Sequence, residues 1–441
     1  MLKRDVRPPK TNPVASVINT FGPPEEVLDA LVTVLDIVRH GDAKTRPEIM
    51  RRTRLGRAVT VQRVDDLLER GLLIEDGLAA SSGGRSPRAV RFNAGAGHIL
   101  VADLGATSIG AGISDLSGNL FEQHEEPSDI TDGPEAIFGR VDELFAELSH
   151  RLDRARGDLW GIGIGVPGPV EFVTGRPTSP PIMPGWDDYP VRERFTDRYR
   201  VPVWVDNDVN LMALGEYRSG VARGHDAVIF IKVGTGIGAG IIIDGKLHRG
   251  SRGSAGDVGH IQVSDDASII CRCGNRGCLE ALAGGAALAR DGSQAARDGR
   301  SQVLARLFAE RGRIEAIEVG WAAAHGDAVS RELVTTAGRR IGLMVATLVN
   351  ALNPSLVVIG GGVAGLGDAL VAAVRETVYA RSLPLATRDL IIARSNLGDE
   401  AGRIGGASLV ADELFSRDRI ATWLPAGSPI GLTELVTMRP R

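Results

Sequence analysis

The sequence predicts an α/β protein in which a small helical domain precedes two related lobes that face a cleft. Apolar residues recur at helical spacing from Val27 to Val38, ahead of any predicted strand. Farther along, three buried strands end in turns of small residues, at Gly105, Gly234 and Gly360. Because these strands are distributed over both halves of the remaining chain, they predict paired lobes rather than one sheet.

Length and composition set further limits. A chain of 441 residues is expected to hold two or three domains, and its 43 % apolar and 24 % charged residues are an ordinary globular balance. The N-terminus lacks the apolar core of a secretion signal, and no apolar run approaches the ~20 residues of a membrane helix. Three clustered cysteines disfavour an oxidising compartment. We therefore expect a cytoplasmic protein without a membrane partner.

The net charge of −4 gives no general attraction to nucleic acid, so any DNA contact has to come from a local patch. Such a patch lies between Lys44 and Arg63, where seven basic residues accompany one acid, Glu48. Three helices are predicted around it, over 27–38, 47–53 and 57–70. In the third, the expected buried stripe is Val61, Val64, Leu67 and Leu68, which leaves Arg57, Thr60 and Arg63 facing outward.

A strand and a basic hairpin containing Arg85 and Arg88 follow the helices. This order predicts a winged helix-turn-helix over residues 25–93, with the third helix in a major groove and the wing arginines on phosphates or in the minor groove. The predicted DNA contacts are Arg57, Thr60, Arg63, Arg85 and Arg88. The alternative is a small helical interaction module with a solvated basic face.

The three small-residue turns predict phosphate contacts. A strand ending in Asp103, Gly105 and Thr107 can present backbone N–H groups to phosphate, with the aspartate near Mg²⁺, although many β-hairpins look alike. Gly234-Thr235-Gly236 forms a second cradle, and Gly360-Gly361-Gly362 lets a nucleotide approach the backbone. Two lobes carrying such loops match the actin-like, ribonuclease-H-like fold of sugar kinases.

A strand over 201–205 ends in Asp206-Asn207-Asp208. A carboxylate at a strand end, opposite a phosphate loop, is placed to take a proton from a sugar hydroxyl. The alternative, equally weighted for this segment alone, is an Asx-rich turn that satisfies its own backbone.

All three cysteines, Cys271, Cys273 and Cys278, fall within eight positions, and His260 lies eleven residues before the first. Three thiolates and one imidazole are a complete tetrahedral set for Zn²⁺, which leaves no open position and so predicts a structural metal. The alternative is three buried, inert thiols. Asp257 precedes the histidine by three residues, and Glu280 follows the last cysteine.

The Cys-x-Cys-Gly-x-x-Gly-Cys-x-Glu string from Cys271 to Glu280, preceded by Gly-His260, resembles the signature of the ROK family of repressors and sugar kinases. The resemblance extends from about Val27 to Phe415, and the predicted winged helix matches the xylose- and N-acetylglucosamine-type repressors. It implies that Asn207, Asp208, His260 and Glu280 hydrogen-bond a hexose, that Asp257 stands where the family has glutamate, and that Asp208 matches the catalytic base. It also assigns Asp103, Gly105 and Thr107 to the first phosphate motif, Gly234 to Gly236 to the second, and Gly360 to Gly362 to the adenosine motif.

Two departures from the kinase pattern weaken a catalytic interpretation. Ala106 and Ser108 replace a glycine and a lysine of the first phosphate motif, so a methyl group crowds the phosphate and a charge-assisted hydrogen bond is removed. Asp257 is also shorter than the family's glutamate.

The sequence thus favours a sugar-responsive repressor that binds operator DNA as a homodimer or homotetramer. The alternative is a hexose or amino-sugar kinase using Mg·ATP and Asp208 as base, alone or combined with regulation. A third interpretation treats the fold as an oligomerisation platform.

These features divide the chain into five expected segments. The first two are a mobile arm over 1–24 and the winged helix over 25–93. A first lobe over 94–210 is completed by a returning helix over 394–415, and a zinc-carrying second lobe covers 211–393. The tail over 416–441 has no assignment.

Overall fold

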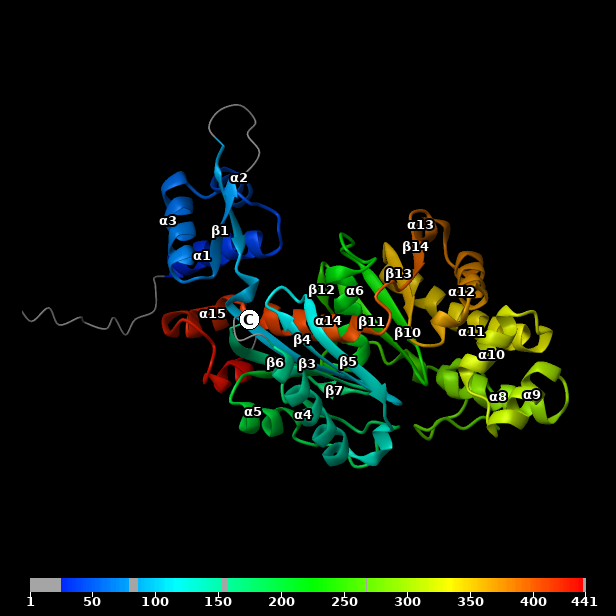
Figure 1. Cartoon of the computed structure of the whole chain (residues 1–441). Helices are drawn as coiled ribbons and strands as arrows, with labels where there is room; N and C mark the ends of the chain where they lie inside the picture. The colour runs from blue at the N-terminus through cyan, green and yellow to red at the C-terminus, as the bar shows by residue number, and fades with distance from the viewer. Residues whose placement is uncertain (1–24, 79–85, 153–156, 267, 439–441) are drawn as a thin grey trace, which may run out of the picture.

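The computed structural model describes residues 25–78, 86–152, 157–266 and 268–438. The predicted arm over 1–24 and the wing residue Arg85 lie outside these residues. Two mixed β-sheets, each flanked by helices, form the main body, and three helices with a two-stranded sheet lie at the N-terminal end (Figure 1). The α/β, two-lobed, actin-like prediction is confirmed at this level.

The N-terminal elements are α1 (Glu25–Arg39), α2 (Arg46–Thr53), α3 (Arg57–Glu69), β1 (Leu73–Leu78) and β2 (Arg88–Phe92), and the two strands pair antiparallel. A capping box begins α2, because Glu48 accepts a hydrogen bond from the Thr45 backbone N–H while the Thr45 hydroxyl accepts one from that of Glu48. Arg54 ends the helix in the left-handed conformation, with φ of 58°.

The outward placement of Thr60 and Arg63 on the third helix is wrong. Both are buried, together with Val64 and Leu67, whereas Val61 is 37 % exposed. The helix is therefore rotated by roughly 60° from the predicted phase, since Val64 and Leu67 belong to both stripes. Two contacts offset part of the cost of this burial: the Thr60 hydroxyl donates to the Gly56 carbonyl, and Arg63 Nη1 pairs with Asp66 at 3.0 Å, while Arg63 Nε has no partner among the described residues.

The first sheet has the strand order β5-β4-β3-β6-β9. Its strands are β3 (Gly97–Leu104), β4 (Ser108–Asp115), β5 (Leu120–Pro127), β6 (Asp158–Val166) and β9 (Val203–Asn207). The first three form an antiparallel meander, and β6 and β9 extend the sheet in parallel with β3. Helices α4 (Pro134–Arg151) and α5 (Val191–Tyr199) pack on one face, and α14 (Glu400–Leu414) packs on the other.

The second sheet repeats this arrangement, in the order β12-β11-β10-β13-β14. Its strands are β10 (Val228–Val233), β11 (Ile237–Ile243), β12 (Lys246–Leu247), β13 (Leu356–Gly360) and β14 (Ile391–Arg394). On one face pack α11 (Ala328–Leu352) and α12 (Asp368–Arg381), and α6 (Asp208–Ser219) packs on the other. Both sheets therefore consist of a three-stranded meander followed by two parallel strands. This shared topology makes the two lobes structurally related, as the sequence predicted.

The remaining short elements connect or cover these sheets. The helices are α7 (Leu279–Ala283), α8 (Gly285–Arg297), α9 (Gln302–Arg311), α10 (Ala316–Ala324), α13 (Pro384–Thr387) and α15 (Arg417–Trp423); the two-residue strands are β7 (Val170–Glu171) and β8 (Arg176–Pro177). The 3-10 turns are η1 (Ala94–Ala96), η2 (Ile130–Asp132), η4 (Val258–His260), η5 (Ala364–Leu366), η6 (Leu424–Ala426) and η7 (Thr433–Thr437).

Helices α6 and α14 cross closely between the sheets because glycine lies at the contact. A Cβ on Gly215 would come within 2.0 Å of the Ala401 carbonyl oxygen, and one on Gly405 within 1.8 Å of that of Leu211. Larger residues at these positions would force the two helices apart, so their positions are tightly linked.

The C-terminal segment, which has no assignment from sequence, belongs to the core. Trp423 is fully buried, with ring centroids 5.4 Å from Trp160 and 5.7 Å from Phe415. These rings form a hydrophobic cluster that also contains apolar residues of α1 and β2. The N-terminal domain is therefore seated on the C-terminal helices.

In the part of the chain that the structure describes, no helix combines the length and apolarity that crossing a membrane requires.

Candidate functional site

A cleft of about 900 Å³ opens between the two sheets. Its lining includes most of the residues singled out from the sequence: Asp103, Gly105, Thr107, Asn207, Asp208, Gly234, Thr235, Gly236, Asp257, His260, Glu280, Gly361 and Gly362. Gly360 does not line it. A Cβ there would meet the Phe230 ring at 2.4 Å, so packing requires a glycine at this position, and its assignment to the adenosine motif stays a prediction.

Asp103 ends β3 on the floor of the cleft. Burial raises the pKa of its carboxyl to about 7, with the negative charge of Asp208 adding to the effect and Lys232 and Arg403 opposing it. One of its oxygens, Oδ1, is buried and receives no hydrogen bond from the described residues. Asp103 therefore changes its protonation state near neutral pH.

This raised pKa predicts a pH dependence of stability. Since the folded state holds the Asp103 proton more tightly than the unfolded state, its contribution to stability is present at low pH and is lost as pH rises from about 4 to about 7. The loss is at most about 1.4 kcal/mol per pH unit. Thermal unfolding of the wild type and the Asp103→Asn variant at pH 5, 6, 7 and 8 checks this. We expect the wild type to lose stability relative to the variant up to pH 7; parallel profiles would contradict it.

Asn207 and Asp208 begin helix α6 at the cleft. The Asn207 side-chain oxygen caps the helix by accepting hydrogen bonds from the backbone N–H groups of Val209 and Asn210, at 2.9 and 3.2 Å. Its amide group donates to the Gly168 carbonyl and to Asp208 Oδ1. These contacts bear out the Asx-turn alternative for Asn207. Its contact with a sugar stays a prediction, and such a ligand would share the side-chain amide with Gly168 and Asp208.

Asp208 is 3 % exposed and has partners on both oxygens. Oδ1 accepts from Asn207 Nδ2 at 3.1 Å and from the Val209 N–H at 2.9 Å. Oδ2 forms an ion pair with Lys232 of β10. Asp206, just before, is also buried and pairs with Arg249 at 2.7 Å. Neither cation was identified from the sequence, although a lysine inside the apolar strand over 228–233 is a signal for a buried partner.

The second glycine loop lies against Glu280. The backbone N–H of Ile237 donates to Glu280 Oε2 at 3.2 Å, and a Cβ on Gly236 would come within 2.3 Å of that oxygen. Glycine at this position is therefore what lets the carboxylate approach the loop. Through this contact Glu280, which follows the cysteine cluster, is held beside the predicted phosphate cradle.

The histidine and the three cysteines converge as predicted, and their ligand atoms lie within 4.8 Å of one another. His260 Nδ1 is 3.5 Å from Cys271 Sγ, and Cys273 Sγ is 3.8 Å from Cys278 Sγ. A tetrahedral ion with bonds of about 2.3 Å to sulfur and about 2.05 Å to nitrogen has edges of roughly 3.8 and 3.6 Å. The cluster therefore fits a metal ion. Burial and the neighbouring thiols raise the pKa of Cys278 to about 12, so its thiolate needs a cation beside it.

His260 connects this cluster to the cleft because its two nitrogens face different sides. Nδ1 is directed to Cys271, while Nε2 lies 3.8 Å from Asp257 Oδ1, and both residues line the cleft. Asp257 is 43 % exposed at its side chain, so it remains accessible to a ligand. One imidazole can thus bind metal and a cleft ligand at once.

The predicted DNA contacts divide into three groups. Arg57 is exposed at the start of α3, as expected. Thr60 and Arg63 are buried, as described above. Arg88 is exposed but pairs with Glu75 at 2.7 Å, so a phosphate has to exchange with that carboxylate. Further exposed arginines beside Arg57 are Arg51, Arg52 and Arg54.

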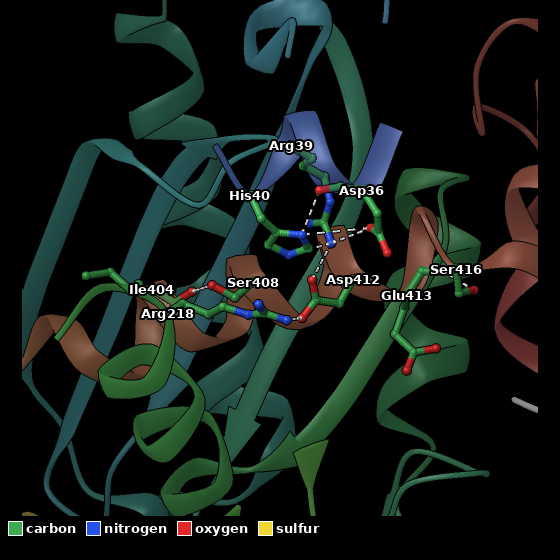
Figure 2. Close-up of polar contacts among 9 residues, drawn as sticks. All are labelled: Asp36, Arg39, His40, Arg218, Ile404, Ser408, Asp412, Glu413 and Ser416. Carbon is green, nitrogen blue, oxygen red and sulfur yellow. Dashed lines mark hydrogen bonds and ion pairs between the residues drawn. The ribbon is translucent and has the colours of Figure 1, made fainter. Parts of the chain in front are cut away.

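A polar link joins the cleft to the N-terminal domain. Helix α6 begins at Asp208 in the cleft, and Arg218 in its last turn pairs with Asp412 of α14 at 2.5 Å. The second oxygen of Asp412 pairs with Arg39 at the end of α1, at 2.8 Å, and Figure 2 shows this carboxylate between the two guanidinium groups. Both arginines lower the pKa of Asp412 against the effect of burial, so it stays ionised. We call Arg218, Asp412 and Arg39 the relay.

Comparisons with known proteins agree with this geometry. The profile of the ROK family matches residues 99–413. A xylose repressor of Caldicellulosiruptor bescii is 31 % identical over 387 residues, which are 87 % of this chain and 95 % of the relative. A glucokinase of Halalkalibacterium halodurans is 33 % identical over 317 residues, 72 % of this chain and 96 % of the relative.

Among solved structures, a ROK family transcriptional regulator that is a homologue of the E. coli Mlc protein covers 94 % of this chain and all of its own, with a TM-score of 0.74 and 23 % identity. This likeness concerns the fold, and it includes the N-terminal part that the glucokinase match leaves uncovered.

Proposed function

This chain belongs to the ROK family, and from that premise we propose that it is a transcriptional repressor whose affinity for operator DNA is set by a sugar in the inter-lobe cleft. The observation that carries the proposal is the relay. Helix α6 has 12 residues, so it extends about 18 Å from Asp208 to the relay. A sugar that displaces the start of α6 moves a charged contact of α1 as well.

The ligand side of the proposal uses the cleft residues. Asp208, Glu280, Asp257 and His260 supply carboxylates and an imidazole, which suit the hydroxyl groups of a neutral sugar. For the ligand to change DNA affinity, it must bind two conformations unequally; lobe closure around the sugar provides that difference.

Zn²⁺ is the proposed metal, because three thiolates and one imidazole suit it best and leave no open position for catalysis. When bound, it fixes the segment between His260 and Cys278. The imidazole Nε2 then faces the cleft in one orientation.

On the DNA side, we propose that residues 25–93 form a winged helix-turn-helix. Order of elements and exposed arginines support it: Arg51, Arg52, Arg54 and Arg57 lie at the end of α2 and the start of α3. A homodimer or homotetramer in the cytoplasm would present paired copies of this domain to two half-sites.

The test is operator affinity with and without sugar. Purified full-length protein selects an operator from a random DNA library, and D-glucose, D-xylose, N-acetylglucosamine and their phosphates are screened by thermal shift. We expect the sugar that raises the melting temperature to change operator affinity at least about fivefold. In Asp412→Asn and Arg218→Gln variants, the thermal shift remains while the change in operator affinity falls below about twofold, because the relay is cut.

Arg417→Gln is the matched control. Arg417 pairs with Glu25 at 3.1 Å and with Asp29, so this variant also removes an ion pair between α1 and the C-terminal helices, but one without a link to α6. Its sugar response is expected to equal that of the wild type. Equal loss of response in the control and the relay variants would contradict the proposed route.

A second candidate, a sugar kinase, is favoured by the Gly234–Gly236 loop and by the glucokinase relatives. A coupled ADP-release assay with the same sugars separates the two. Turnover that Asp208→Asn abolishes would support the kinase; sugar binding without turnover would support the regulator.

A further inference from the structure

Lys232 is a cation that lines the cleft and contacts one residue of the proposed sugar site, Asp208. The four residues before it on β10, Val228 to Ile231, are fully buried and apolar. Its own side chain is 23 % exposed, lines the cleft and forms an ion pair with Asp208. Asp208 begins α6 and Lys232 belongs to the second sheet, so the pair joins two elements across the cleft floor.

Lys232 is in contact with Asp208 and feels the charge of Asp103 as well. Asp208 and Asp103 together hold the pKa of Lys232 above its ordinary value, although burial lowers it, so the ammonium stays charged. Asp103 Oδ1 receives no hydrogen bond from the described residues, and Asp208 uses both oxygens on its partners. In the resemblance to sugar kinases, Asp103 corresponds to the acid near the magnesium nucleotide. Asp208 corresponds to the base at the reacting hydroxyl.

A divalent cation has to compete with Lys232 in this arrangement. Mg²⁺ needs free carboxylate oxygens in octahedral geometry. Here Lys232 forms an ion pair with Oδ2 of Asp208, so this oxygen is not free for a metal ion. The positive charge of the Lys232 ammonium also repels a divalent cation at Asp103. Arg403, which also lines the cleft and pairs with Glu125 at 3.0 Å, adds to this positive charge.

We propose that Lys232 takes the place of a divalent cation in this cleft, so that the cleft binds a neutral sugar without a magnesium nucleotide. The ammonium neutralises the Asp208 carboxylate and keeps Asp208 as a hydrogen-bonding group rather than a base. This inference rests on the proposed sugar site but is independent of DNA binding.

The experiment measures binding of Mn²⁺ alone, a paramagnetic substitute for Mg²⁺, by electron paramagnetic resonance of the free ion. It uses full-length wild type, Lys232→Met and Lys232→Gln, the charge-conserving control Lys232→Arg, and the double variant Lys232→Met/Asp208→Asn. Thermal unfolding shows which variants are folded. If Lys232→Met is unfolded, Lys232→Gln is used as the neutral variant. Thermal shift with the identified sugar is recorded on the same samples.

We expect Lys232→Met or Lys232→Gln to bind Mn²⁺ at least tenfold more tightly than the wild type. Lys232→Arg should behave as the wild type, and the double variant should lose the gain. The proposal would be overturned if the wild type bound Mn²⁺ as tightly as Lys232→Met does. It would also be overturned if no folded neutral variant bound Mn²⁺ more tightly than the wild type. Failure of the proposed function is seen separately, as wild-type protein without a sugar-induced thermal shift or a change in operator affinity.

Discussion

Replacing Cys278 with serine is expected to remove the metal and the response to sugar together. Cys278 is fully buried and contributes one of four ligands, so its loss leaves an incomplete set around the ion. Structural zinc sites contribute folding free energy of ~10 kcal/mol or more in small domains, and here the affected region is the segment between His260 and Cys278. Without the ion, the imidazole has no fixed orientation toward the cleft.

Three measurements check this prediction. Elemental analysis should give about one equivalent of zinc per wild-type chain and none for Cys278→Ser. Sugar affinity should fall at least about tenfold, as is usual when the support of a metal-bound histidine is removed. Arg272→Ala is the control, because Arg272 lies between two of the ligands but is exposed, and we expect it to retain both metal and response. Wild-type protein without a transition metal would contradict the prediction.

The second large effect concerns DNA. An Arg54→Ala/Arg57→Ala variant is expected to bind operator roughly 100-fold more weakly, since each charge-assisted hydrogen bond to phosphate contributes about 1.5 kcal/mol. The dependence of affinity on salt should also decrease, by a slope of about 0.9 for each phosphate that the variant no longer neutralises. Both side chains are exposed, so the variant should unfold at the wild-type temperature.

Two matched variants isolate this effect. Arg300→Ala/Arg306→Ala removes two exposed arginines of the second lobe and should leave operator affinity unchanged. Arg63→Ala should act mainly through stability, because Arg63 is buried beside Asp66. Unchanged operator affinity in Arg54→Ala/Arg57→Ala would show that another surface binds DNA.

The parts of the site that the sequence predicted are those encoded locally. The cysteine cluster is held by spacing within 18 residues after His260, and the glycine loops directly follow their strands. Neighbouring residues determine the geometry of each motif, whereas the assignment of His260, Gly236 and Asp208 to one site came from the family resemblance, and all three do line the cleft.

What could not be predicted depends on long-range contacts. Lys232 meets Asp208 only after the second sheet packs on α6, and Arg39 meets Asp412 across 373 positions. The phase of α3 was ambiguous for a different reason. Two stripes of helical spacing were available, and the one containing Thr60 and Arg63 is buried because these polar groups find partners within the helix or its preceding turn.

The seating of the N-terminal domain on the C-terminal segment has a consequence for synthesis of the protein. Phe92 packs edge-on against Phe415 at 5.3 Å, and Leu435 is buried in the same cluster. A ribosome adding ~5–20 residues per second makes the last of these roughly 20–70 s after the first. A nascent or truncated chain therefore carries the N-terminal domain before the C-terminal surface that seats it exists, so the proposed sugar control of DNA binding requires these C-terminal residues.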